Sequence, residues 1–251
     1  MRALEAALGQ DLFERRGRGL VLTEAGRIAL DHAEAIFRTA DDLTATLRDT
    51  GRARRALRVG AQATLSRNFQ MQFLAPLIGR PDVEVVLRAG SQDELRRGLG
   101  TLALDVVLTN LAPHRDAASP GLVHRIAEQP VGLIGTRART GAPRPLRDLL
   151  AAEPLIAPTR ETALRAGFDA LAARLGVTPP FAAEVADIAK SRLLARADAG
   201  LAVIPPIVVR DELSSGNLVE ASRLDGITAT FFAVTQARRF PNPLPSDILH
   251  R

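Results

Sequence analysis

Residues 1–26 read MRALEAALGQDLFERRGRGLVLTEAG and contain, in order, the patterns of a helix end, a tight turn and a helix start. Leu4 and Leu8 lie one helical turn apart, and the glycine that follows is suited to the left-handed conformation that ends helices. Two short β-prone runs, 12–14 and 20–22, then flank a turn rich in glycine and arginine, as in a β-hairpin. The segment therefore predicts a short helix followed by a hairpin with arginines at its tip.

A long helix is predicted next, from Thr23 to about Leu47. Thr23 resembles an N-cap, and Glu24 places a carboxylate in the first turn, where the helix dipole favours it. Small and apolar residues recur along this helix at heptad spacing, which suits one partner helix. We interpret the seam as a dimer contact, the alternative being a helix packed on its own domain. The seam residues are Ala29, Ala33, Ile36, Ala40, Leu43 and Leu47.

After a linker at 51–55 (GRARR), the chain alternates short β-prone runs with helical stretches. Strands separated by helices predict a mostly parallel sheet, and so many strands favour two small sheets, hence two lobes with a cleft between them. The predicted strands are 57–61, 83–89, 105–110, 122–127, 131–135, 154–158, 181–185, 201–205, 218–221 and 228–235. The predicted helices are 66–78, 91–99, 162–175, 187–198 and 206–214.

The bulk composition indicates a folded protein that stays inside the cell. Apolar residues make up 46% and charged residues 24% of 251 residues, and no apolar run is long enough for a membrane span. The first residues do not resemble a secretory signal, so a cytoplasmic location is expected. The absence of cysteine excludes disulfides and thiolate chemistry. The net charge of +5 comes almost wholly from arginine, with Lys190 the one lysine, and does not itself indicate a nucleic-acid partner.

The N-terminal segment resembles the end of the DNA-binding domain of LysR-type transcriptional regulators. The family pattern there is a leucine-glutamate pair followed by LG, LF, R, R, LT and AG. The later runs RVGA, LDVVLTN and GLAVIPP are also similar to the family. The matching residues of the first segment are Leu4-Glu5, Leu8-Gly9, Leu12-Phe13, Arg15, Arg18, Leu22-Thr23 and Ala25-Gly26.

The resemblance implies an α/β fold, in which a periplasmic-binding-protein-like effector domain of two lobes follows a long linker helix and a partial winged helix-turn-helix. It implies a DNA-binding part at 1–22, a linker helix at 23–55, effector lobe I at 56–128 and 236–251, and effector lobe II at 129–235. In the family, the helix that reads base edges mostly precedes the position of Met1. The chain is therefore expected to be shortened at its N-terminus, with the wing present and sequence reading in doubt.

Several local runs resemble one subgroup, the regulators of sodium/proton antiporter genes. These runs are RALEAALGQDLFERRGRGL, VGAQATLSRNF, LDVVLTN and FPNP. This resemblance implies a response to sodium or alkaline conditions.

The arginines of the hairpin tip, Arg15, Arg16 and Arg18, are the predicted phosphate or minor-groove contacts, with Arg2 as a further candidate. Taken alone, a basic turn is usually solvated surface, and the family resemblance is what favours DNA contact. Such contacts position a protein on DNA without specifying sequence.

Candidate effector-binding residues follow the predicted strands of both lobes. Hydroxyls between a strand end and a helix start favour an anion, although simple helix capping explains the same pattern. A carboxylate ligand would also use Arg160, whose guanidinium matches its geometry, whereas a cation would have only Glu161 and Asp187 nearby. The effector, an organic anion or an ion, stays open. The candidates are Thr64, Ser66, Ser91, Thr109, Asn110, Thr159 and Arg160.

No enzyme, cofactor or metal site is predicted. The four histidines, His32, His114, His124 and His250, are scattered and show no spacing of a metal site or a triad. The sequence therefore favours a ligand-responsive regulator that forms a homodimer or homotetramer, with DNA and a small effector as partners. The alternatives are a solute-binding protein of similar two-lobed fold and a dimerisation partner that does not bind DNA.

Overall fold

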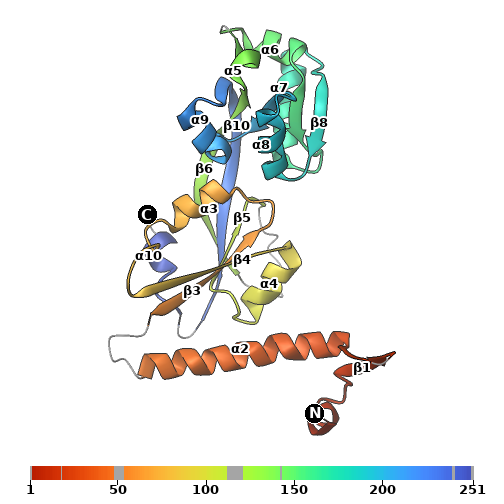
Figure 1. The fold of residues 1–251 in the computed structure, drawn as a ribbon, viewed down its shortest axis with the longest axis vertical. Helices are drawn as coiled ribbons and strands as arrows, with labels where there is room; N and C mark the ends of the chain where they lie inside the picture. The colour runs from red at the N-terminus through yellow and green to blue at the C-terminus, as the bar shows by residue number, and fades with distance from the viewer. Residues whose placement is uncertain are drawn as a thin grey trace.

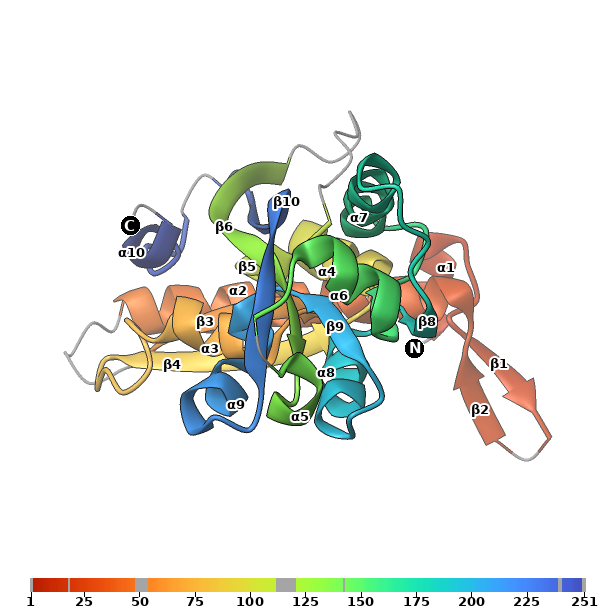
Figure 2. The same ribbon diagram turned by 90° about the horizontal axis from the view of Figure 1, so that it is seen from above.

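The computed structural model describes residues 2–17, 19–47, 54–111, 121–141, 143–238 and 241–249. Its N-terminal part has the predicted order: helix α1 (Arg2–Leu8), strands β1 (Phe13–Arg16) and β2 (Gly19–Leu22), and helix α2 (Glu24–Leu47). The two strands pair antiparallel, with Phe13 opposite Leu22. Figure 2 shows this hairpin projecting beyond the rest of the molecule. The predicted hairpin and long helix are confirmed, while 51–53 of the predicted linker lie outside the described residues.

The hydroxyl group of Thr23 joins the hairpin to α2 because it acts as both a hydrogen-bond donor and an acceptor. The oxygen accepts a hydrogen bond from the amide of Gly26 at 2.9 Å, which caps the helix, and the hydroxyl donates to the carbonyl of Asp11 at 2.7 Å. Gly26 lies against the carbonyl oxygen of Leu12, and a Cβ at this position would be 2.0 Å from that oxygen. The junction therefore requires a hydroxyl at 23 and a glycine at 26.

Lobe I is the part of the sheet nearest α2 together with its helices, and lobe II is the part at the other end (Figure 1). In lobe I, β3 pairs in parallel with both β4 and β5. The elements of lobe I are β3 (Arg55–Gln62), α3 (Arg67–Leu74), β4 (Val83–Gly90), α4 (Gln92–Gly100), β5 (Val106–Thr109) and α10 (Ser246–Leu249). An ion pair between Arg97 on α4 and Asp31 on α2, 3.7 Å long, joins lobe I to the long helix.

In lobe II, β7 pairs in parallel with both β8 and β9. The predicted helix at 206–214 is a 3-10 turn followed by a short helix, and three further short helices, α5, α6 and α10, were not predicted. The elements of lobe II are α5 (Arg137–Thr140), α6 (Leu146–Ala152), β7 (Leu155–Pro158), α7 (Ala163–Arg174), β8 (Phe181–Val185), α8 (Ile188–Arg196), β9 (Leu201–Ile204), η1 (Pro206–Val209) and α9 (Arg210–Ser215).

Two long antiparallel strands, β6 (Gly121–Gly135) and β10 (Val219–Gln236), cross from one lobe to the other. The sequence predicted each of them as two separate strands, and this prediction was wrong. The hydrogen bonds also run through one sheet of eight strands, in the order β4-β3-β5-β10-β6-β9-β7-β8, and not through two small sheets. Within the sheet, the pairs inside each lobe are parallel and those involving the crossing strands are antiparallel.

Irregular pairing explains why the sequence concealed the continuity of these strands. Pro130 and Gly226 interrupt the β-prone runs and read as turn residues, but each lies inside a strand. Pro130 pairs with Thr228 next to a register shift between Arg223 and Thr228, and Gly226 has a φ of 79° there. Strands tolerate proline and glycine at such bulges because the ladder of hydrogen bonds is already broken.

The largest apolar core crosses from lobe I to lobe II on the α3 face of the sheet. Phe69 of α3 stacks on Phe231 of β10 with ring centroids 3.9 Å apart. The Asn68 side chain donates a hydrogen bond to the carbonyl of Val208 in η1 at 3.3 Å. Both contacts hold α3 against lobe II, so this face joins the lobes through packed side chains. Within the part of the chain that the structure describes, no helix has the length and apolarity to cross a membrane.

We expect Gly26→Ala to loosen the junction between the hairpin and α2 by about 2 kcal/mol, because the new Cβ meets a backbone oxygen that cannot move independently. Hydrogen exchange should become faster for the amides of residues 10–23. Gly100→Ala is the matched control, since a Cβ there meets nothing within 4 Å. Unchanged exchange in Gly26→Ala would show that the close approach is not needed.

Candidate functional site

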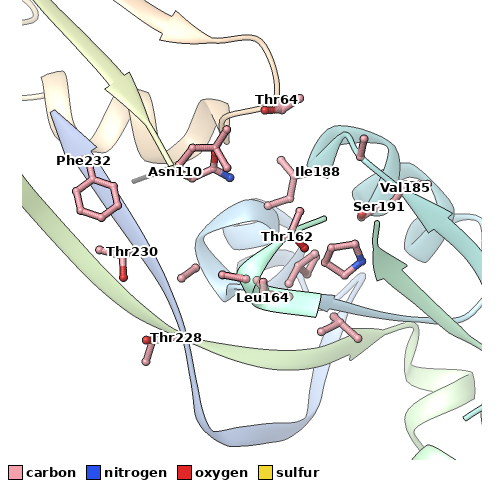
Figure 3. A pocket seen from close by; sticks show the side chains of 17 residues that line it. Thr64, Asn110, Thr162, Leu164, Val185, Ile188, Ser191, Thr228, Thr230 and Phe232 are labelled. Atoms are coloured by element: carbon pink, nitrogen blue, oxygen red, sulfur yellow. The ribbon is translucent and has the colours of Figure 1, made fainter. Parts of the chain in front are cut away.

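A cavity of about 280 Å³ lies between the two lobes. Figure 3 shows Thr64 and Asn110 on one side of it, with Thr162, Ile188 and Ser191 across from them. It is lined by Thr64, Asn110, Leu111, Pro158, Thr162, Ala163, Leu164, Val185, Ala186, Ile188, Ser191, Val203, Ile204, Thr228, Ala229, Thr230 and Phe232.

Strand ends and helix starts form most of this cavity. Asn110 follows β5, Pro158 ends β7 and Val185 ends β8, so the carboxyl ends of parallel strands from both lobes meet here. This is where α/β sheets usually bind ligands. The crossing strand β10 contributes Thr228 to Thr230 and Phe232, so a molecule in the cavity would touch the segment that joins the lobes.

Two of the predicted effector residues, Thr64 and Asn110, line the cavity. Three others make hydrogen bonds within the fold. Ser66 caps α3 by accepting from the amide of Phe69 at 3.4 Å, and Ser91 forms a capping box with Glu94 at the start of α4. The hydroxyl of Thr109 donates to the Gln62 side chain at 2.7 Å. The two serines therefore act as helix caps in the structure, which is the alternative to ligand contact given above.

Thr159 and Arg160 do not line the cavity. The pKa of Glu161 is lowered by a hydrogen bond from its own backbone amide and by one from the Thr159 side chain, so Thr159 already has a partner. The Arg160 side chain is 77% exposed and lies 3.7 Å from a carboxylate oxygen of Glu184. The structure therefore does not bring this arginine to the cavity wall.

The sequence interpretation missed four hydroxyl residues of the cavity: Thr162, Ser191, Thr228 and Thr230. Thr162 caps α7 by accepting from the amide of Arg165 at 3.2 Å, and Thr228 donates to Glu128 at 2.9 Å. A capping pattern after β7 marks Thr162 in the sequence. Ser191 lies in the middle of a helix and Thr230 in the middle of a strand, so neither carries a local signal.

Arg165 is the buried cation nearest the cavity, and its hydrogen-bonding groups are directed at protein partners. Its side chain, 3% exposed, forms ion pairs with Asp169 at 2.8 Å and Glu184 at 3.1 Å. It also donates to the carbonyl of Pro158 at 3.1 Å and lies over the ring of Phe181. The arginine thereby joins α7 to the ends of β7 and β8.

The described residues contain no group of three or more His, Asp or Glu side chains that could hold a metal ion. Of the histidines, His32 is exposed on α2 and His124 lies 3.1 Å from the hydroxyl of Thr235. His114 and His250 lie outside the described residues.

The predicted DNA-binding arginines lie on the N-terminal part. Arg2, Arg15 and Arg16 are exposed, and Arg16 forms an ion pair with Glu14 at 3.1 Å. Arg18 lies outside the described residues.

The predicted seam of α2 is largely uncovered in this chain. Ile36 is 67% and Leu43 is 58% exposed, Ala40 is exposed, and Ala29 and Ala33 are half-buried. The side chain of Leu47 is outside the described residues. Phe37, 71% exposed, and Leu30, 46% exposed, extend the apolar surface beyond the predicted seam.

Comparison with protein families gives two matches. The profile described as "LysR substrate binding domain" matches residues 50–249, and "Bacterial regulatory helix-turn-helix protein, lysR family" matches residues 1–27. A two-lobed ligand-binding domain that follows part of a helix-turn-helix head defines a class of bacterial regulators. The chain belongs to the LysR family, which confirms the predicted family and fold class and the expectation that it is not an enzyme.

Individual relatives agree with this assignment. The chain is 30% identical to the transcriptional regulator DgdR of Burkholderia cepacia over 58% of its length and 49% of that protein. It is 28% identical to the regulator CbbR of Rhodospirillum rubrum over 53% of its length and 44% of that protein. These matches span about half of each relative. The crystal structure of the LysR regulator CbnR covers 100% of this chain and 87% of its own, with a TM-score of 0.63 and 24% identity, a likeness of fold.

We expect Arg165→Met to destabilise lobe II by about 1–3 kcal/mol, because two carboxylates and a backbone carbonyl lose their buried donor. Both carboxylates are partly exposed, which keeps the cost below that of a fully buried pair. Arg160→Met is the control and should change stability little. Denaturant unfolding of the three proteins measures the difference, and equal midpoints would refute this role of Arg165.

Proposed function

We propose that this protein is a ligand-responsive transcriptional regulator that binds a small effector in the cavity between its lobes. The observation that carries this proposal is the composition of the cavity wall. Lobe I contributes Thr64 and Asn110, lobe II contributes the starts of α7 and α8, and β10 contributes Thr228, Thr230 and Phe232. A molecule that contacts all three changes the relative free energies of different lobe arrangements, which is how ligands shift a conformational equilibrium.

The division into a DNA-binding part (1–22), a linker helix (23–55), lobe I (56–128 and 236–251) and lobe II (129–235) belongs to this proposal. A change between the lobes would reach DNA through α2, which contacts lobe I by the Arg97–Asp31 ion pair and carries the hairpin at its N-terminal end. The site of action would be the cytoplasm, where bacterial DNA lies.

Dimerisation through α2 is the second part of the proposal. The exposed apolar residues of α2, among them Ile36, Phe37 and Leu43, lie on a helix whose opposite side meets lobe I through Asp31. Burying such a stripe against a second copy removes it from water, at about 25 cal/mol for each Å². A homodimer or homotetramer is the expected assembly.

We expect Ile36→Glu to convert the assembly to monomers, because a carboxylate in the seam must lose water without gaining a partner. Leu193→Glu, at a side chain 60% exposed on α8, is the control for surface charge. Sedimentation velocity gives the mass of each variant. A dimer that persists in Ile36→Glu would place the contact elsewhere.

DNA contact by the hairpin is the third part. Arg15 and Arg16 are exposed on the projecting β1–β2 hairpin, and the comparison structures include full-length CbnR complexed with its target DNA. In this chain, we propose that Arg2, Arg15, Arg16 and Arg18 contact the DNA backbone, which positions a protein on DNA without specifying sequence.

We expect Arg15→Ala combined with Arg16→Ala to weaken duplex binding alike for all sequences, and to reduce the slope of log affinity against log salt by about two. Fluorescence anisotropy at low salt is the measurement, with Arg174→Ala on α7 as control. An unchanged slope would exclude the hairpin as a phosphate contact. A chain that binds no duplex yet forms mixed dimers with a full-length relative would favour the alternative, a dimerisation partner.

The narrower assignment, a regulator of sodium/proton antiporter genes, stays a prediction. It rests on local sequence runs, and neither DgdR nor CbbR carries such a name. The sodium response that this assignment implies is tested by the comparison of sodium chloride with potassium chloride below.

A further inference from the structure

The side chains of the cavity wall indicate which chemical class of effector the cavity binds. This inference rests on the function proposed above. None of the described residues that line the cavity carries a charge. The walls are mainly aliphatic and aromatic, with Leu111, Leu164, Val185, Ile188 and Phe232 among them. A charged ligand placed here loses water and gains no opposite side-chain charge from these residues, which is unfavourable.

Two arginines near the cavity already have carboxylate partners. Arg165 is held by Asp169 and Glu184, and Arg160 points its guanidinium at Glu184 as well. A carboxylate ligand would have to compete with these groups for either arginine.

The helix starts at the cavity, which would otherwise attract an anion, have carboxylates of the chain beside them. Asp187 caps α8 by accepting from the amide of Ala189 at 2.9 Å, and the cavity residues Ala186 and Ile188 flank it. Glu161 directly precedes the capping residue of α7 and lies within hydrogen-bond reach of Thr159. The positive ends of both helix dipoles therefore already have negative charge nearby, and a further anion would be repelled.

Neutral hydrogen-bonding groups remain on two sides of the cavity. Thr64 and Asn110 of lobe I lie across from Ser191 of lobe II, and all three residues line the cavity. Hydroxyl and amide groups on opposing walls can donate to and accept from a neutral polar group of a ligand. The volume of about 280 Å³ suits a small molecule, since an apolar cavity of roughly 150 Å³ holds benzene in another protein.

From this arrangement we infer that the effector is an uncharged, largely apolar molecule about the size of a substituted benzene ring, with a neutral hydrogen-bonding group that reaches Ser191 or the Thr64–Asn110 pair. The apolar body fills the space between Ile188, Leu164 and Phe232. Organic anions, organic cations and bare metal ions are disfavoured by the same wall.

The test uses three probes of nearly equal shape, benzamide, benzoate and benzylammonium, on the full chain. Isothermal titration and the shift in melting temperature report binding. Benzamide should bind about tenfold or more tightly than either charged probe, because only the charged probes lose ionic hydration without compensation. Sodium chloride is compared with potassium chloride at equal ionic strength.

Two variants of α7 locate the binding. Ala163→Phe fills the cavity from an exposed position on its wall, and Ala166→Phe places the same side chain on an exposed part of the helix that does not line the cavity. Benzamide binding should disappear in the first variant and persist in the second. Tighter binding of benzoate or benzylammonium, a stabilisation specific to sodium, or no binding of any probe would each overturn the inference.

These outcomes separate this inference from the proposed function. If benzoate binds and Ala163→Phe abolishes its binding, the cavity remains a ligand site and only the class of ligand is wrong. Failure of the regulator proposal itself would be seen in the duplex-binding and sedimentation measurements, which involve no probe.

Discussion

The structure depends on the pairing of two long strands, β6 and β10. Their hydrogen bonds run from the Gly121–Gln236 end in lobe I to the Gly135–Val219 end in lobe II. The strands of lobe I join this pair through β10, and those of lobe II join it through β6. Without the pair, each lobe would have a second open sheet edge in addition to β4 or β8, and open edges are prone to pair with other chains. The relative orientation of the lobes is therefore set largely by the twist of one antiparallel ribbon.

The two sides of that ribbon have different surroundings. On one side, the Phe69–Phe231 stack and the contact between α3 and η1 fill the space between the lobes. On the other side lies the cavity, bounded by Thr228, Thr230 and Phe232 of the same strand. Packed side chains resist separation, because interiors have little free volume. Movement of the lobes is thus restricted to a change of twist or bend that leaves the packed side in contact.

Helices and strands whose β-prone or capping residues lie within the element itself could be predicted from local sequence. FAAEV was predicted with the bounds that β8 has, and Thr23 correctly marked the start of α2. The crossing strands were divided because Pro130 and Gly226 carry turn signals, and only the partner strand shows that they lie at bulges. Among the site residues, Thr64 and Asn110 follow strands and were found for that reason. Ser191 and Thr230 were missed because tertiary packing alone brings the middle of a helix and the middle of a strand to one wall.

The double hydrogen bond of Thr23 has a practical consequence for anyone who recombines such proteins. The Thr23 hydroxyl connects the end of the α1–β1 connection to the first turn of α2, and Gly26 lies in close contact with Leu12. The segment before α2 and the start of that helix therefore form one packed unit. A chimera cut between the hairpin and the helix would sever this unit, whereas one cut beyond the C-terminal end of α2 would transplant it whole. In related regulators, the segment that corresponds to residues 2–22 should accordingly be exchanged together with the helix that follows it.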